Sequence, residues 1–251
     1  MKRMRLDKLV VYRGLAASRD RAQALILAGQ VQVSGTSPIK AGSLVPIDVD
    51  IKLDKPDHPY VSRGGVKLAH ALEIFGIPVH GKNTLDIGAS TGGFTDVLLR
   101  RGAAHVVALD VGHGQLDWKL RNDPRVTTLE RVNARSLHPN TFPTSCQKFD
   151  IITIDVSFIS LKQILPGVLR LLNSNGDVVT LVKPQFEAER SEIRKGGLIR
   201  DPNVHTRVIK EISRAAHEVG LKQIATTPSP ITGMEGNQEF FLHLCTTQET
   251  S

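Results

Sequence analysis

TLDIGASTGGF, residues 84–94, is the stretch that decides the fold. Its apolar first part predicts a buried strand at 84–87, and the small residues that follow predict a tight turn that opens a helix after Gly92. Small residues let a ligand approach the backbone, and the N-terminus of the helix offers free N–H groups. A glycine turn between a strand and a helix is often only a tight connection, so the surrounding sequence has to decide.

The sequence after this turn alternates apolar strands with helices. Strands are expected at residues 106–109, 126–129, 151–154 and 178–182, with a helix at 159–172, followed by a helix at 204–219 and strands at 221–225 and 239–244. Such alternation predicts a parallel sheet that is buried between helices on both faces. The last two strands would close the sheet, an antiparallel strand being one option. The predicted fold class is therefore α/β, of the Rossmann-like kind.

The first 55 residues have a different pattern and predict a small α+β domain. A short helix should end at Gly14, and a second helix should be capped by Ser18 and end at Gly29. Period-two alternation then predicts strands at 31–34 and 44–51. Residues 54–59, DKPDHP, have the composition of a linker. The expected organisation is a domain at 1–55, a linker at 56–63 and a second domain at 64–251.

Positive charge is concentrated at the N-terminus. The chain has a net charge of +7, and residues 1–35 hold seven Lys and Arg against two Asp. A basic end on a nearly neutral body suits a domain that neutralises phosphates, although a solvated helix face would give the same count.

Cys146 and Cys245 are isolated, which predicts neither a disulfide nor a metal site. With no apolar run of the ~18 residues that span a bilayer and no signal peptide, we expect a cytoplasmic protein. We expect a monomer, because no coiled-coil pattern or large apolar surface pattern appears.

The glycine turn departs from the dinucleotide-binding pattern G-x-G-x-x-G, because Ser90 stands at the second glycine position. This favours an adenosyl ligand with an amino-acid end, S-adenosylmethionine, whose carboxylate can meet backbone N–H groups while Asp86 receives its ammonium group. Asp110 lies twenty-two residues after Gly88, at the end of the next strand, where a carboxylate can accept both ribose hydroxyls. The predicted cofactor-binding residues are Asp86, Gly88, Ser90, Gly92, Gly93, Phe94, Asp110 and Val111.

Charged residues stand at the carboxyl ends of the predicted strands, where open α/β sheets bind their ligands. Asp155 and Lys183 each directly follow an apolar strand, and either one alone would be read as the exposed start of a loop. Lys67, before the glycine turn, and Glu239, at the start of the last strand, complete a set of four candidates.

The N-terminal words RLDKLVVYRGLAASRDRAQALILAGQVQVSG resemble the S4 RNA-binding domain. The resemblance implies that basic side chains contact RNA phosphates, which set position without reading sequence. The aromatic content of 4% agrees with this, because it disfavours a platform that stacks bases. The residues implied in RNA binding are Arg5, Lys8, Arg13, Arg19 and Arg21, with Arg63 added from the linker.

The words VSRGGVKL, DIGASTGGFTD, IDVSFIS, LVKPQFE and NQEFFLHL resemble the TlyA family, whose catalytic domain is similar to the FtsJ-type RNA ribose methyltransferases. The resemblance implies S-adenosylmethionine-dependent 2′-O-methylation of cytidine in ribosomal RNA or ribosomal subunits. It also implies a catalytic tetrad of Lys67, Asp155, Lys183 and Glu239. In that tetrad Lys183 takes the proton of the ribose hydroxyl, Lys67 stabilises the developing alkoxide, and the two carboxylates orient the amines.

Other interpretations stay open at this point. An RNA-binding protein with an inactive methyltransferase fold is disfavoured by the intact turn and tetrad, and a pseudouridine synthase would need no such turn. A base methyltransferase would use other residues at the strand ends. The family's historical name of haemolysin suggests a membrane-active protein, which the lack of a spanning segment disfavours. Some family members carry Arg-x-Trp-Val in the linker, where this chain has HPYV at 58–61, so the resemblance does not extend to linker control of cofactor binding.

Overall fold

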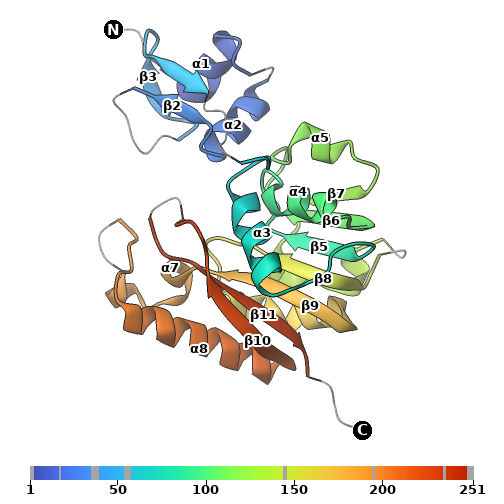
Figure 1. Cartoon of the computed structure of the whole chain (residues 1–251). Coiled ribbons are helices and arrows are strands. Elements are labelled where there is room, and N and C mark those ends of the chain that lie inside the picture. The colour runs from blue at the N-terminus through green and yellow to red at the C-terminus, as the bar shows by residue number, and fades with distance from the viewer. Residues whose placement is uncertain are drawn as a thin grey trace.

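The computed structural model describes residues 3–16, 18–34, 40–53, 58–143, 146–193, 196–233 and 236–247. Within these ranges the chain forms a small N-terminal domain (residues 3–53) and a larger α/β domain (residues 58–247), each with its own hydrophobic core (Figure 1). Of the linker expected at 56–63, residues 56 and 57 lie outside the described residues. No helix among the described residues is both long and apolar enough to cross a membrane.

The N-terminal domain packs two helices on short strands. Its elements are β1 (Arg3–Arg5), α1 (Leu6–Tyr12), α2 (Arg19–Leu27), β2 (Val31–Val33), β3 (Leu44–Pro46) and β4 (Ile51–Leu53). Both predicted helices are confirmed, and Ser18 caps α2 by accepting a hydrogen bond from the backbone of Arg21. The single strand predicted at 44–51 is wrong, because β3 pairs with β1 whereas β4 pairs with β2. A turn in which Val49 donates to the carbonyl of Pro46 separates them.

A seven-stranded sheet in the order β10-β11-β9-β8-β5-β6-β7 forms the centre of the α/β domain. Its strands are β5 (Asn83–Ile87), β6 (His105–Asp110), β7 (Val126–Glu130), β8 (Phe149–Ile154), β9 (Leu172–Val182), β10 (Leu221–Pro228) and β11 (Phe240–Thr246). β5 to β9 are parallel, and β11 lies antiparallel between β9 and β10. The predicted strands and the antiparallel closure of the sheet are confirmed.

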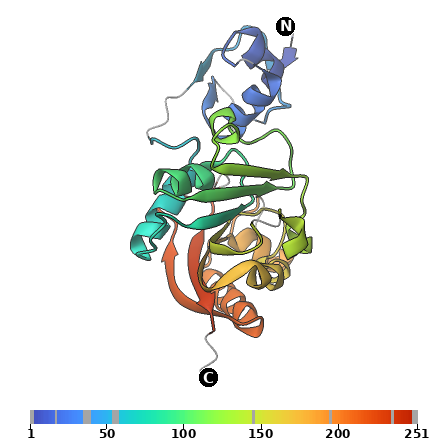
Figure 2. The same cartoon turned by 90° about the vertical axis from the view of Figure 1, so that its right-hand side faces the viewer.

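Helices cover both faces of this sheet, as predicted (Figure 2). One face packs against α3 (Gly64–Ile74), α4 (Gly93–Arg100) and the short α5 (Trp118–Arg121), and the other against α6 (Leu165–Leu171) and α8 (Pro202–Glu218); α7 (Pro184–Glu187) follows β9. The helix predicted at 159–172 is shorter than expected. A 3-10 turn at Leu161–Gln163 precedes α6, and Leu172 already belongs to β9.

Candidate active site

Two glycines of the turn between β5 and α4 lie so close to other atoms that no residue with a side chain fits in their place. Gly88 has a φ of +86°, and a Cβ there would lie 2.2 Å from the carbonyl oxygen of Asp155. Gly92 has a φ of +96°, and a Cβ there would overlap the side chains of Leu116 and Leu120. Both positions combine a left-handed backbone with a close contact, so only glycine fits without strain. The turn therefore lies directly against the carboxyl end of β8.

Asp110 connects this turn to the end of β6. Its Oδ2 accepts a hydrogen bond of 2.8 Å from the backbone N–H of Ser90, which has a left-handed φ of +48°, and its Oδ1 accepts one of 2.6 Å from Gly112. Ser90 and Asp110 line a narrow pocket together with Gln115. Val111, the next residue, exposes 71% of its surface. The carboxylate thus lies where the sequence placed it, at a strand end beside the turn.

Asp86 and Phe94, also predicted to bind the cofactor, are buried. Asp86 points into the layer beneath α4, where it accepts hydrogen bonds from Thr95 (2.7 Å) and Thr153 (3.1 Å). Burial raises the pKa of Asp86 to about 7, and the charge of Asp155 adds to the effect. The carboxyl group of Asp86 has no exposed surface, and its role toward the ammonium group of a ligand stays a prediction. Phe94 packs against Phe241 in the core, with ring centroids 6.1 Å apart.

The two charged residues at the ends of β8 and β9 form an ion pair. Nζ of Lys183 lies 2.6 Å from Oδ1 of Asp155 and donates a hydrogen bond of 3.0 Å to Oγ of Ser157. The side chains of Lys183 and Asp155 are only 12% and 23% exposed. Sequence reasoning missed Ser157, because a serine three residues after a strand has no signal of its own. The amine is therefore held in place at the carboxyl edge of the sheet.

The other two predicted catalytic residues form a second ion pair at the same edge. Lys67, on α3, donates a hydrogen bond of 2.5 Å to Oε2 of Glu239, and both side chains are nearly buried. Glu239 directly precedes β11, in which Phe240 is paired with Val182. The next step of this antiparallel register brings Glu239 opposite Lys183, and opposed residues point to the same face. The ladder thus brings the four charges of the predicted tetrad to one edge of the sheet.

The basic residues predicted to bind RNA mostly have partners within the chain. Arg5 and Arg19 both donate to the buried carboxylate of Asp7, as does Gln23, and their side chains remain 41% and 49% exposed. The guanidinium of Arg5 holds the pKa of Asp7 well below its usual range. These arginines stabilise the domain and still present part of each guanidinium to solvent.

The remaining RNA-binding candidates differ in what they contact. Arg13 donates to the carbonyl groups of Val49 (2.6 Å) and Ile47, and Arg63 donates to that of Thr232 (3.4 Å). Arg21 forms an ion pair with Asp117, at the start of α5, and so connects the two domains. Lys8 is exposed and forms no ion pair with any described residue.

Tyr60 and Val61 tie the end of the linker to α4. The backbone N–H of Val61 donates a 3.0 Å hydrogen bond to Asp96, and Arg100 donates to the carbonyl of Pro59 at 2.9 Å. The guanidinium of Arg100 lies over the ring of Tyr60, 5.8 Å from its centroid. Because α4 starts at the glycine turn, this end of the linker is attached to the same helix as the candidate cofactor site.

Comparisons with known proteins match both domains of the chain. The FtsJ-like methyltransferase family model matches residues 60–246, and the S4 domain model matches residues 4–41. The 16S/23S rRNA (cytidine-2′-O)-methyltransferase TlyA of Mycobacterium tuberculosis (strain ATCC 25618 / H37Rv) is 46% identical over 98% of this chain and 91% of its own length. Hemolysin A of Brachyspira hyodysenteriae is 44% identical over 96% and 99%. The solved structure of a Streptococcus thermophilus protein described as a hemolysin has a TM-score of 0.76 and 42% identity, covering 99% of this chain and 90% of that one.

Proposed function

The chain belongs to the TlyA family of FtsJ-like methyltransferases, and from this membership we propose that it transfers the methyl group of S-adenosylmethionine to a ribose 2′-hydroxyl of ribosomal RNA. One observation carries the proposal. Two lysine–carboxylate pairs, Lys67–Glu239 and Lys183–Asp155, meet at the sheet edge beside a glycine turn. The target nucleotide is a cytidine, by analogy with the rRNA methyltransferase relatives.

The residues around the turn fit S-adenosylmethionine. The N-terminus of α4 and the small residues Gly88, Ser90, Gly92 and Gly93 can approach an amino-acid carboxylate. Asp110, whose two oxygens already accept backbone N–H groups, can accept the ribose hydroxyls, and the exposed Val111 can cover the adenine ring. The bound cofactor supplies an electrophilic methyl group. Phe94 and Asp86 would act from the core, by fixing α4 and the turn.

The tetrad would activate and position the ribose hydroxyl. Lys183 would accept the proton of the 2′-hydroxyl, and a cofactor bound at the turn would supply the methyl group to the ribose oxygen. Asp155 and Ser157 hold the amine in position, so the step needs little reorganisation. Glu239 holds Lys67, whose charge stabilises the developing alkoxide.

The N-terminal domain would bind and position the RNA. We assign residues 1–55 to this domain, 56–63 to the linker and 64–251 to the catalytic domain. Lys8 and the exposed parts of Arg5 and Arg19 suit phosphate contacts, whereas Arg13, Arg21 and Arg63 would first have to share or release their partners. A ribosomal RNA substrate places this activity in the cytoplasm.

The test is to locate the transferred methyl group. The protein is incubated with labelled S-adenosylmethionine and purified small and large ribosomal subunits, and nuclease fragments are analysed by mass spectrometry. A methyl group on a ribose 2′-oxygen is the expected result. A methyl group on a base would refute the roles given to the tetrad, and no transfer to either subunit, despite cofactor binding in calorimetry, would indicate an inactive RNA-binding protein.

A further inference from the structure

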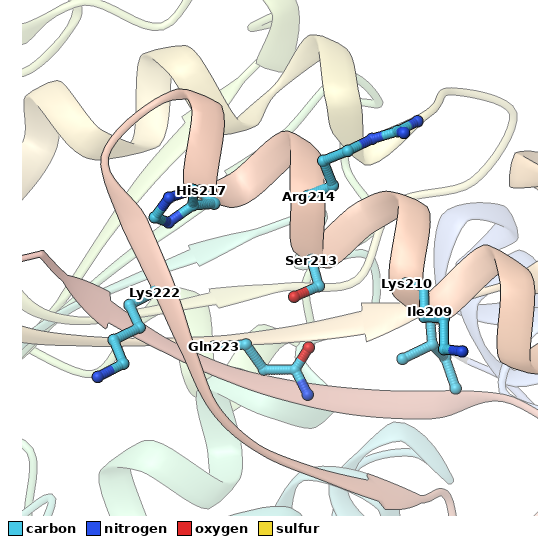
Figure 3. A pocket seen from close by; sticks show the side chains of 7 residues that line it. All are labelled: Ile209, Lys210, Ser213, Arg214, His217, Lys222 and Gln223. Carbon is cyan, nitrogen blue, oxygen red and sulfur yellow. The ribbon is translucent and has the colours of Figure 1, made fainter.

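A groove opens on the α/β domain between the second half of α8 and the start of β10 (Figure 3). It has a volume of about 410 Å³ and is lined by Ile209, Lys210, Ser213, Arg214, His217, Lys222 and Gln223. Lys222 is paired with Cys245, at the opposite end of β11 from Phe240. Phe240 adjoins the proposed catalytic edge, which is the edge of the sheet that holds Lys67, Asp155, Lys183 and Glu239. This α8–β10 groove is therefore separate from the candidate active site.

The groove presents hydrogen-bond donors and no carboxylate among its lining residues. Ser213 and Gln223 lie at its centre, and the exposed Lys210, His217 and Lys222 surround them (Figure 3). No described residue forms an ion pair with Lys210 or Lys222. Lysine, serine, glutamine and histidine side chains can all donate to the oxygens of a phosphate group. The chemistry of the groove therefore matches an anion rich in acceptors.

The acidic residues nearest to the groove do not neutralise its lysines. Glu211, on the same helix, is already bound by Lys162 and Arg207. Glu218 lies 3.9 Å from Arg214, which extends away from the other lining side chains (Figure 3). The two lysines of the groove thus differ from the arginines of the N-terminal domain, whose charges are largely engaged within the fold.

We propose that the α8–β10 groove is a second RNA contact, which takes backbone phosphates of the ribosomal RNA at a point remote from the methylated nucleotide. This inference rests on the proposed function, because it assigns a second surface to the same substrate. The groove is open and exposed, so one phosphate ion gains little by entering it. A large RNA that is already docked elsewhere on the protein reaches the groove at a high effective concentration, and two lysine contacts then add to its affinity.

The location of the groove predicts a dependence on substrate size. An RNA that folds around the protein can reach both the catalytic edge and the far end of the sheet. A short hairpin that carries only the target nucleotide reaches the catalytic edge alone. Loss of the two lysines should therefore weaken the methylation of intact rRNA and spare that of the hairpin.

The experiment compares K210Q/K222Q with a control of equal charge change, R135Q/R170Q, which alters two exposed arginines on the 3-10 turn at Ala134–Ser136 and on α6. We expect K210Q/K222Q to raise KM for intact rRNA about tenfold with kcat unchanged. The log–log salt dependence of binding should become shallower by about two counterions. The hairpin should be methylated at the wild-type rate by both variants.

Three results would overturn the proposal: wild-type KM and salt dependence in K210Q/K222Q, equal losses in R135Q/R170Q, or tight binding of inorganic phosphate alone to the groove in calorimetry. Circular dichroism and melting curves check that both variants fold. RNA binding is measured by fluorescence anisotropy beside the methylation assay. If the wild type methylates no RNA, the proposed function fails, whereas a selective loss of binding in K210Q/K222Q would still support the groove.

Discussion

The N-terminal domain and the catalytic edge both gather acidic and basic side chains, but they do so around different centres. In the N-terminal domain a single buried carboxylate, Asp7, is surrounded by donors from Arg5, Arg19 and Gln23, and both arginines reach solvent. At the catalytic edge each carboxylate holds one lysine, and the lysines are almost buried. The first arrangement stabilises a fold, whereas the second holds amines in place beside the candidate cofactor site.

The same contrast applies to Asp7 and Asp86, the two fully buried aspartates among the described residues. Asp7 lies among cations, which keep its pKa well below the usual range, whereas Asp86 has two threonine hydroxyls as partners and its pKa rises to about 7. Burial alone therefore does not determine whether a carboxyl group is charged. The neighbouring residues decide it, and these come from distant parts of the sequence.

The largest effect is expected at Glu239. Replacing it with alanine leaves the buried Lys67 without a partner, and breaking a buried pair in this way costs about 3–5 kcal/mol of stability. Methyl transfer should also fall, by roughly 100-fold or more, because the alkoxide loses a positioned cation. Urea unfolding and single-turnover assays measure the two effects. Glu239→Gln keeps an acceptor and should recover much of the stability; an E239A protein with normal stability and turnover would contradict the role of this pair.

Asp86 should give the stability of the α/β domain a distinct pH dependence. Because its folded pKa of about 7 lies above the unfolded value of 3.8, only the unfolded state ionises between these values. The contribution of Asp86 to stability is therefore complete below about pH 4 and is lost as the pH rises to 7, by up to about 1.4 kcal/mol per pH unit. Urea unfolding at several pH values should show a flatter profile for Asp86→Asn than for the wild type. Identical profiles would refute the raised pKa.

A smaller effect of opposite sign is expected at Asp7. Its folded pKa is lowered, so its contribution to stability is present above the unfolded pKa of 3.8 and is lost as the pH falls through the folded value. Asp7→Asn should destabilise the N-terminal domain by about 2 kcal/mol at neutral pH, since charged hydrogen bonds are weakened while both arginines can turn to water. Melting followed by hydrogen exchange separates this domain from the rest. If α1 and α2 kept their protection against hydrogen exchange in Asp7→Asn, the contacts of Asp7 with Arg5 and Arg19 would not be what stabilises these helices.

Most of the fold follows from local sequence signals, and the errors occur where tertiary contacts decide. Apolar runs and the glycine turn predict β5, β6, β8 and β9 correctly. The alternation through residues 44–51 continues across a turn, so it hides the change of partner between β3 and β4. The helix α3, which carries Lys67, was not predicted from its residues, because its first turn holds the weak helix formers Gly64 and Gly65.

Only part of the candidate site could be predicted, because local sequence signals place some of its residues and tertiary contacts place the others. Asp155 and Lys183 follow apolar strands, so their place at the sheet edge could be derived, and the family resemblance added Lys67 and Glu239. The direction of Asp86 could not be derived, because neighbouring residues of a strand face opposite layers and the sequence does not say which layer holds the ligand. The partner of Arg21, Asp117, lies ninety-six positions away in the other domain, beyond any local signal.

The most direct test of the proposed chemistry is single-turnover methyl transfer to intact rRNA by Lys183→Ala, with Lys148→Ala as a control at an exposed lysine. We predict a loss of about 10²–10⁴ in the rate of methyl transfer for Lys183→Ala, with binding of S-adenosylmethionine and of RNA unchanged in calorimetry and anisotropy, and a normal rate for Lys148→Ala. A Lys183→Ala protein that methylates the ribose at the wild-type rate would contradict the assignment of Lys183 as the base.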